Sequence, residues 1–459
     1  MNEHVGDRAV VLGGSVAGLF AARVLADFYR AVTVVDRDPL VGATGPRRAV
    51  PQGHHIHGLL ARGQQIIEEL FPGFTKEMAA GGVPTRDFGT SLGWHFGGRM
   101  IRKVETDLVC ISPGRWLLEE RMRARVGELS NVSFLDRTDV VGLDASPDGG
   151  RITGVSVHRR DAQGFGSPRA LPADLVVDAT GRGSRTPRWL TELGCPRVVE
   201  EEVRMDLTYT TCDFHAPLDT DPIGDDIAII SVATPGNPRG ATFARLPDRY
   251  SVSLNGILGD RPPTDPDGFL EYVRSLPVPQ IFESVRRAEP LTTPVSFRFP
   301  SSIRRRYERL ARLPEGLLVL GDAACVFNPI YAQGMTVAAI GAVVLRDHLA
   351  GGARDARRYF RDLARAIDPP WDMSAGGDLG FPGVVGRRTV KVRLGNAYLP
   401  RLQAAATEDP VVARAFMRVA GLVDRPEALM RPAMVSRVLF PTLTGGRRAR
   451  EVGRRSSGG

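Results

Sequence analysis

The sequence predicts an α/β protein in which a Rossmann-like dinucleotide-binding domain is interleaved with an antiparallel sheet and followed by a helical C-terminal region. Three observations predict this fold class. A βαβ pattern with a glycine-rich turn opens the chain, and a buried strand followed by an acid and a glycine helix start lies nearly three hundred residues later. Alternating strand patterns occupy much of the chain between them.

The first forty residues have the pattern of a strand, a turn, a helix and a second strand. These segments are residues 8–12 (RAVVL), 13–18 (GGSVAG), 19–29 and 32–35. Gly13 permits a tight turn, Gly18 lets the helix pack closely on the strand, and Asp36 follows where a ribose-binding acid is expected. Ser15 departs from the GxGxxG fingerprint, but serine is small enough for the backbone to approach a phosphate. Together these features predict a dinucleotide site.

The second motif lies in residues 317–342 (LLVLGDAACVFNPIYAQGMTVAAIGA). Asp322 follows Gly321 at the end of a short apolar run, so its carboxylate is expected at the C-terminal edge of a buried strand, where α/β sheets bind ligands. An acid there can accept hydrogen bonds from a polyol. Pro329 turns the chain, and Gly334 opens a helix whose N-terminal N–H groups carry partial positive charge. A flavin pyrimidine edge suits this helix end.

The chain between and after these motifs predicts the domain organisation. Helical and strand patterns over residues 112–181 belong with the dinucleotide domain, and strand patterns over residues 200–297 predict an antiparallel sheet. The predicted domains are residues 1–80, 105–195 and 299–350 (dinucleotide binding), 81–104 and 196–298 (substrate-binding sheet), 351–445 (C-terminal helices) and 446–459 (disordered basic tail).

Composition excludes several functional classes. The net charge is +8, of which the arginine-rich tail supplies +4. The sequence contains no basic helix or strand interleaved with aromatic residues, so we do not expect nucleic-acid binding. The four cysteines form no CxxC pair, so we expect neither zinc nor disulfides, and reduced thiols favour the cytoplasm. The sequence contains no span of about 20 apolar residues, so we expect no transmembrane helix. The string Arg304–Arg306 is interpreted as a solvated face.

The motifs GGSVAG and GDAACVFNPIYAQGMTVAA resemble those of the FAD-dependent monooxygenase superfamily with the p-hydroxybenzoate hydroxylase fold. The resemblance covers most of the chain and implies FAD as the cofactor. It places Arg115 at the FAD phosphates or ribityl chain, Arg48 near the pyrophosphate, and the backbone of Val140 at the adenine. The full set of implied FAD contacts is Gly13, Gly14, Ser15, Ala17, Gly18, Asp36, Arg37, Arg48, Arg115, Val140, Gly321, Asp322, Pro329, Gly334 and Met335.

More narrowly, RRAVPQGHHIHGLL and the second motif are similar to actinomycete flavin enzymes that include polyene epoxidases of polyether antibiotic pathways. This similarity implies that one oxygen atom of dioxygen is transferred, through a flavin C4a-hydroperoxide, to a bulky apolar natural-product intermediate. Epoxidation is favoured over hydroxylation and needs no side-chain base. His57 and Tyr331 are the candidate proton donors. For the cluster of His54, His55 and His57 we favour hydrogen bonding over metal ligation, because no carboxylate or cysteine accompanies it.

Two alternatives remain open. A flavin reductase of double bonds, similar to geranylgeranyl reductases, shares the same cofactor motifs. A flavin-binding protein without turnover, acting as a partner in a biosynthetic complex, is the other. The superfamily's DG motif, tied to both FAD and NAD(P)H, appears as Thr180 and Gly181 in DATGRGS. The electron donor is therefore either NAD(P)H or a separate reductase partner.

Overall fold

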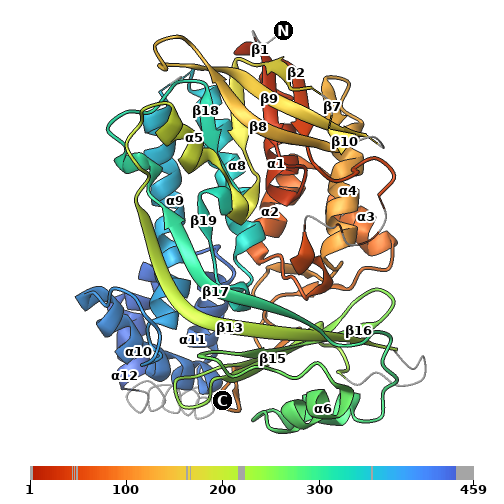
Figure 1. Cartoon of the computed structure of the whole chain (residues 1–459). Helices are drawn as coiled ribbons and strands as arrows, with labels where there is room; N and C mark the ends of the chain where they lie inside the picture. The colour runs from red at the N-terminus through yellow and green to blue at the C-terminus, as the bar shows by residue number, and fades with distance from the viewer. Residues whose placement is uncertain are drawn as a thin grey trace, which may run out of the picture. The chain divides into compact units, whose positions relative to one another are not determined.

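The computed structural model describes residues 4–43, 45, 47, 50–161, 164–165, 167–215, 223–352 and 355–440. Contacts between residues divide the chain into two compact units (Figure 1). Unit 1 comprises Met1–Val83, Pro113–Arg204 and Pro300–Ala375, and unit 2 comprises Pro84–Ser112, Met205–Phe299 and Gly376–Gly459. Each unit is therefore assembled from three separated stretches of sequence.

A parallel five-stranded sheet forms the centre of unit 1. In spatial order its strands are β18 (Leu317–Val319), β12 (Leu175–Asp178), β1 (Gly6–Leu12), β2 (Tyr29–Val35) and β7 (Val132–Leu135). The register pairs Leu12 with both Asp178 and Val35, and Asp178 with Val319, so the carboxyl ends of these strands lie level. β1 ends in the buried apolar run Ala9–Leu12, and all four residues of β12 are buried, as expected of parallel strands covered on both faces.

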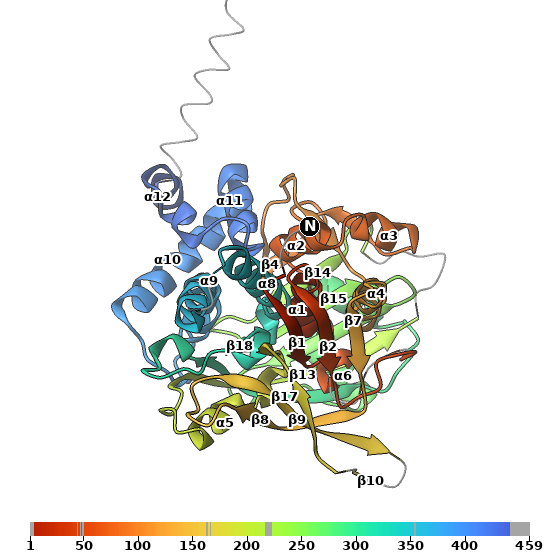
Figure 2. The same cartoon turned by 90° about the horizontal axis from the view of Figure 1, so that it is seen from above.

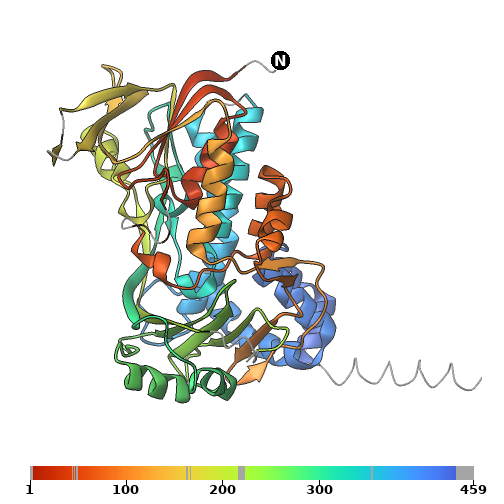
Figure 3. The ribbon, with the colours of Figure 1, turned by 90° about the vertical axis from the view of Figure 1, so that its right-hand side faces the viewer.

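Helices cover one face of this sheet and a β-meander covers the other. Helices α1 (Val16–Leu25), α4 (Arg115–Gly127) and α8 (Gly334–Ala350) lie side by side (Figures 2 and 3). The meander consists of β8 (Thr138–Ala145), β9 (Ile152–Asp161), β10 (Gly164–Phe165) and β11 (Arg169–Pro172). The remaining helices of unit 1 are α2 (Ala61–Leu70), α3 (Phe74–Ala80), α5 (Thr186–Glu192) and α9 (Ala356–Asp378), and short 3-10 turns occupy Pro51–His54, Gly181–Gly183, Gly321–Ala323 and Pro329–Tyr331.

Unit 2 is built on a largely antiparallel sheet. Its strands, in spatial order, are β17 (Val295–Arg305), β13 (Glu200–Phe214), β16 (Tyr250–Gly256), β15 (Arg239–Arg245), β14 (Ala228–Val232), β4 (Leu92–Phe96) and β5 (Arg99–Met100). β13 and β17 are long enough to run from one unit into the other, and in unit 1 β17 pairs with β19 (Cys325–Val326). A separate pair joins β3 (Thr85–Asp87) to β6 (Val109–Ile111).

One face of the unit 2 sheet packs on helices α6 (Pro266–Arg274) and α7 (Pro279–Val285). Phe243 and Val252 from the strands form a buried cluster with Phe269 and Tyr272 of α6 and Ile281 of α7. The C-terminal helices of unit 2 are α10 (Val390–Glu408), α11 (Pro410–Ala420) and α12 (Pro432–Leu439), with a 3-10 turn at Pro426–Met430. The predicted region 351–445 thus falls into both units, because α9 groups with unit 1.

The predicted fold class, an α/β protein with a parallel sheet, further sheets and helices, is confirmed. One local prediction was wrong. The first helix was expected to reach residue 29, but it ends at Leu25, and Tyr29 already begins β2. α9 continues to Asp378 despite Pro369 and Pro370 within it. Among the described residues no helix is long and apolar enough to cross a membrane.

Candidate functional site

Three loops of unit 1 meet at the carboxyl edge of the parallel sheet. They follow β1, β12 and β18, the three adjacent strands whose ends lie level. A Cβ atom on Gly13 would lie 2.7 Å from the carbonyl oxygen of Ala179, and one on Gly321 would lie 2.7 Å from the Cβ of Ala17. The two sequence motifs, about three hundred residues apart, are therefore in van der Waals contact. This edge is where open α/β sheets bind ligands.

The glycine turn at residues 13–18 has the geometry of an anion site. Gly13 has a φ of +97°, which is accessible chiefly to glycine. A Cβ on Gly18 would lie 1.8 Å from the carbonyl oxygen of Gly13, so only glycine permits this approach of helix to turn. Ser15 precedes α1 but its side chain does not cap the helix. The first N–H groups of α1 are thus not satisfied by a side-chain cap and can receive a phosphate.

Asp36, at the end of β2, is bonded to the glycine turn. Its Oδ2 atom accepts hydrogen bonds from the backbone N–H of Gly14 (2.7 Å) and from Arg47 (3.2 Å), and Oδ1 accepts from the backbone N–H of Asp38 (2.8 Å). Asp36 and Arg47 are both buried. Asp36 therefore shapes the turn through Gly14 at the same time as it stands where a ribose-binding acid is expected.

Glu119 of α4 connects the turn to a group of buried arginines. Its Oε2 accepts from the hydroxyl of Ser15 (2.8 Å), and its Oε1 accepts from Arg47 Nε (2.7 Å) and lies 3.4 Å from Arg123 Nη1. Arg115, in the first turn of α4, donates from Nη2 to the same Ser15 hydroxyl (2.9 Å). The serine that departs from the glycine fingerprint thus has a specific role in joining the turn to α4. Sequence reasoning did not find Arg47, Glu119 or Arg123.

Charge balance in this network favours the ionised forms. Burial alone would lower the pKa of Arg47, but the carboxylates of Glu119 and Asp36 outweigh it and raise that pKa. Burial would likewise raise the pKa of Glu119, and Arg47 and Arg115 outweigh it, so the pKa of Glu119 is lowered. A buried pair of this kind is strongly destabilised when one partner is removed, since an unpaired charge remains.

Asp322 lies where the second motif meets the start of α8. A Cβ on Gly334 would lie 3.7 Å from its Oδ1 atom, and among the described residues no hydrogen bond engages its carboxylate. Burial raises the pKa of Asp322, and the positive charges of Arg115, Arg182 and Arg305 oppose that rise. The carboxylate is thus surrounded by cations yet keeps its acceptor sites for hydroxyl donors. α8, like α1, begins without a side-chain cap.

Arg305 holds the backbone of the second motif in place. Its guanidinium donates to the carbonyl oxygens of Asp322 (3.3 Å), Ala323 (3.0 Å) and Arg182 (3.1 Å), and its Nε donates to Glu200 (2.9 Å). The interpretation of Arg304–Arg306 as a solvated face was wrong. Arg304 and Arg305 are buried because acids distant in sequence pair with them, and such partners leave no local pattern.

Asp178, at the end of β12, organises the third loop. It is fully buried and accepts from the backbone N–H and the hydroxyl of Thr180 (2.8 and 2.5 Å), and from the hydroxyls of Ser184 (2.5 Å) and Thr186 (2.6 Å). This loop carries Gly181, whose Cβ would lie 4.0 Å from that of Asp322. The sequence string DATGRGS contained the signal, since an acid followed by closely spaced hydroxyl residues predicts a self-bonded loop.

The segment with three histidines lies against the start of α8. The backbone N–H of Leu60 donates to the hydroxyl of Thr336 (3.1 Å), and a Cβ on Gly58 would lie 3.1 Å from that of Ala332. His57 places Nδ1 at 2.9 Å from the carbonyl oxygen of His55. Burial, reinforced by the charge of Arg115, lowers the pKa of His57 to about 3. His57 is therefore neutral at pH 7, with the protonated Nδ1 donating to that carbonyl oxygen and Nε2 as an acceptor.

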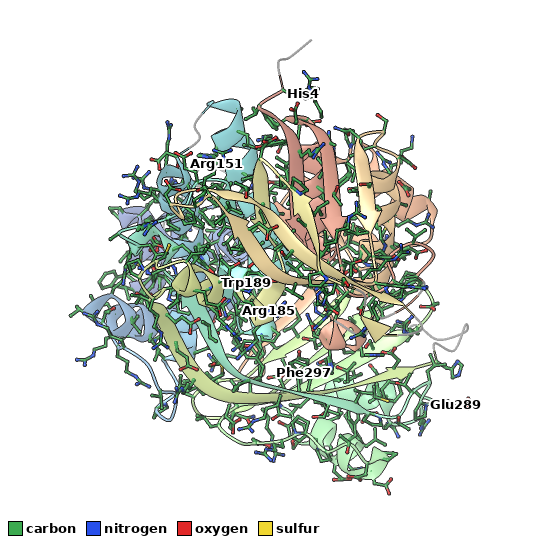
Figure 4. All side chains as sticks on the ribbon, turned by 45° about the horizontal axis from the view of Figure 1, so that its top comes forward. His4, Arg151, Arg185, Trp189, Glu289 and Phe297 are labelled. Carbon is green, nitrogen blue, oxygen red and sulfur yellow. The ribbon has the colours of Figure 1, made fainter. Side chains whose placement is uncertain are left out.

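The other predicted site residues have varied surroundings. The backbone carbonyl of Val140 accepts a hydrogen bond from Arg185, whose guanidinium lies 4.9 Å from the ring centroid of Trp189 (Figure 4). Met335 is buried in the first turn of α8, whereas Arg37 and Pro329 are exposed and Tyr331 is half-buried. Arg48 lies outside the described residues. Among the described residues no group of three histidine, cysteine or acidic side chains is arranged to hold a metal ion.

Comparison with known proteins identifies the family of this chain. No protein-family model matches it. Protein Rv3254 of Mycobacterium tuberculosis is 35% identical over 438 residues, which cover 91% of this chain and 90% of that protein. The chain belongs to the family of Protein Rv3254. Because 91% of the chain is covered, the similarity extends over most of both units.

Solved structures show a similar fold at low identity. The flavoprotein/dehydrogenase from Cytophaga hutchinsonii has a TM-score of 0.66 at 15% identity, covering 96% of this chain and 100% of that one. The flavin-dependent brominase Bmp2 has a TM-score of 0.63 at 16% identity, with coverage of 91% and 93%. PqsL of Pseudomonas aeruginosa, described as a probable FAD-dependent monooxygenase, has a TM-score of 0.57 at 17% identity, with coverage of 89% and 98%. The fold is therefore one found in flavin-dependent enzymes.

Proposed function

We propose that this protein is an FAD-dependent monooxygenase that adds one oxygen atom to a bulky, largely apolar small molecule. The observation that carries the proposal is the contact between the glycine turn after β1 and the Gly321–Asp322 turn after β18, because it brings two uncapped helix N-termini and a hydroxyl-accepting carboxylate to one sheet edge. Such an edge fits an elongated dinucleotide with a polyol in its middle. Neighbours with the same fold are flavin-dependent enzymes, which supports FAD.

Each part of the edge has a role that its chemistry allows. The N–H groups at the start of α1 would bind the pyrophosphate, with Arg115 beside them. Asp36 would accept a ribose hydroxyl, and Asp322 would accept ribityl hydroxyls. The N-terminus of α8, with about half a positive charge, would attract negative charge on the ring system. When bound and reduced, FAD supplies the activation of dioxygen and the transfer of one oxygen atom.

The sheet of unit 2 supports a substrate that is mostly apolar but has one polar end. Opposite the face packed on α6 and α7, a single cross-strand row runs Thr211, Ser253, Thr242, Ile230 and Trp94. All of these but Thr211 are half-buried. The row begins with hydroxyls, including a 2.9 Å hydrogen bond from Thr211 to Ser253, and ends in an aromatic group.

The aromatic end of this row is extensive. The ring of Trp94 stacks on Phe96 with centroids 5.9 Å apart and meets Phe416 of α11 edge-on at 5.8 Å. Aromatic surfaces of this size suit a hydrocarbon or polyene portion of a substrate. We infer an amphipathic natural-product intermediate, with epoxidation favoured over hydroxylation and NAD(P)H or a reductase partner as the electron donor.

Two measurements test this function. Purified protein should carry one FAD per chain, identified by mass after denaturation, and it should consume dioxygen when a reductant and a polyene-containing substrate are supplied. With labelled dioxygen the product should gain one labelled oxygen atom. A product heavier by two hydrogens would instead identify a double-bond reductase. Reoxidation of the reduced flavin that no substrate alters would indicate a binding protein without turnover.

A further inference from the structure

The net positive charge of this protein comes from its C-terminal part. Residues 379–459 contain fifteen basic and five acidic side chains, a net charge of +10, whereas the whole chain carries +8. The preceding 378 residues are therefore slightly acidic. Within residues 379–407 there are five basic side chains and no acidic one. Such asymmetry indicates an anionic partner for this part of the chain.

Exposed apolar side chains concentrate in the same part. Of the thirteen large apolar side chains that are exposed among the described residues, seven lie between residues 385 and 440. The most exposed of these are Val385 (63%), Val390 (73%) and Leu394 (67%). Single exposed apolar residues need no explanation, but several of them within a basic segment form an amphipathic surface.

Helix α10 arranges these residues on one side. Val390, Arg393, Leu394, Ala397 and Arg401 are all exposed and follow a spacing of three and four residues, so they lie on one helical face. The opposite face is held against the rest of the C-terminal helices. There Leu402 and Ala406 are buried, and Tyr398 donates to the carbonyl of Leu429. We call the exposed residues of this face, with Val385 and Arg387, the α10 face.

The loop before α10 is fixed by a dedicated side chain. Arg388 donates to the carbonyl oxygens of Leu379 (3.1 Å), Phe381 (3.0 Å) and Val384 (2.7 Å), and Thr389 caps the helix by accepting from the N–H of Val392. This anchoring holds Val385 at the surface. Among the described residues neither Arg387 nor Arg393 pairs with an acid, so both charges remain available for a partner.

We propose that the α10 face binds the surface of a membrane containing anionic lipids, as a peripheral contact. The basic side chains would meet lipid phosphates, and the tips of Val385, Val390 and Leu394 would enter the boundary between headgroups and acyl chains. A second copy of this chain is disfavoured as the occupant, because the basic charges of Arg387, Arg393 and Arg401 outnumber the one exposed acid of this face, Glu408 at the end of α10, so that two such faces repel. A nucleic acid would leave the apolar tips in water.

The test uses the purified full-length protein and vesicle flotation. Vesicles of neutral phosphatidylcholine are compared with vesicles in which about one third of the lipid is phosphatidylglycerol. The protein should float only with the anionic vesicles, and high salt should release it. The double variant Val390→Ser with Leu394→Ser should lower the partition coefficient about tenfold or more, because two apolar contacts are lost. Replacement of Arg387 or Arg393 by Gln should lower it about fivefold each.

A matched control distinguishes binding by the α10 face from non-specific binding by exposed apolar side chains elsewhere. Val199 is 49% exposed in unit 1 and is followed by Glu200, Glu201 and Glu202, so Val199→Ser should leave flotation unchanged. The flavin content of every variant reports on its folding and tests the proposed function separately. Absence of flotation at low salt would overturn the proposal. So would flotation that Val390→Ser with Leu394→Ser leaves intact, or a loss of self-association in that variant without any vesicle binding by the native chain.

Discussion

At the scale of single residues, Asp322 is a carboxyl group whose ionised form is only partly stabilised by the protein without FAD. Burial raises its pKa, and nearby arginines oppose that rise without bonding to it. Hydroxyl donors from a ribityl chain would favour the ionised form, so FAD binding and deprotonation of Asp322 should be coupled. The affinity for FAD should fall as the pH decreases through the raised pKa of this carboxyl.

Substitution of Asp322 tests this coupling. Asp322→Ala should yield protein with little bound flavin, and Asp322→Asn should bind FAD about ten- to a hundredfold more weakly, since a hydrogen bond to a charged group contributes about 1.5–3 kcal/mol. Titration of apoprotein with FAD at several pH values measures both effects. Asp347→Asn, a change of an exposed acid on α8, is the control. Full flavin occupancy in Asp322→Ala would refute the assigned role.

Ser15 illustrates how one residue can replace a fingerprint glycine. Its hydroxyl connects Arg115 to Glu119, so Ser15→Gly should restore the fingerprint but loosen the first turn of α4. We expect a several-fold weaker affinity for FAD, because Arg115 loses the hydroxyl that orients it, and a stability loss of about 1 kcal/mol from one hydrogen bond. Titration with FAD and urea unfolding measure the two effects. Tighter binding in Ser15→Gly would show that the fingerprint glycine alone matters.

At the scale of elements, the approach of the two motifs depends on glycines that tolerate no Cβ. Gly321 has a φ of +63° and faces the Cβ of Ala17. Gly321→Ala should therefore abolish flavin retention, while the pair Gly321→Ala with Ala17→Gly should recover part of it, because the clash is removed and only the backbone strain remains. Absorbance of purified protein at the flavin band, relative to protein concentration, measures retention.

A control in a neighbouring loop makes this double variant decisive. Gly183 has open space where a Cβ would stand, so Gly183→Ala should keep its flavin. No second substitution can relieve Gly18→Ala, because its Cβ would overlap the backbone carbonyl oxygen of Gly13. This variant should lose its flavin with or without Ala17→Gly. If Ala17→Gly does not improve Gly321→Ala at all, the contact between the two motifs is not what positions the second turn.

Elements with a local signal were predicted well, and those that depend on distant partners were not. β1, β18 and α8 follow from apolar runs and from the glycines beside them, which short windows of sequence contain. Arg47, Glu119 and Arg305 were missed or misread because key partners are far along the chain: Glu119 is 72 positions from Arg47, and Glu200 is 105 positions from Arg305. The antiparallel sheet was predicted as a region, but the row from Thr211 to Trp94 requires a register that only the fold supplies.

At the scale of the whole molecule, several buried groups together determine how stability depends on pH. Burial lowers the pKa of His55 to about 4 and that of His57 to about 3, so both are neutral in the folded protein, whereas in the unfolded chain they titrate near 6.5. The stability that depends on these two neutral histidines is present above pH 6.5, near their pKa in the unfolded chain, and is lost as the pH falls below that value. Glu119, with a lowered pKa, adds a loss at still lower pH, and Asp322, with a raised pKa, acts in the opposite direction.

We therefore expect the free energy of unfolding of the apoprotein to decrease between about pH 6.5 and pH 4, by up to about 1.4 kcal/mol per pH unit for each of the two histidines. Urea unfolding at a series of pH values measures this slope. His57→Gln should flatten it by up to half, because one of the two protonations is removed. His4→Gln, at an exposed position near the N-terminus, should leave it unchanged. A flat profile over this range in the native sequence would mean that the buried histidines are protonated in the folded state. In that case Nε2 of His57 would be a proton donor, the role first predicted from the sequence, instead of the acceptor indicated by its hydrogen bond to His55.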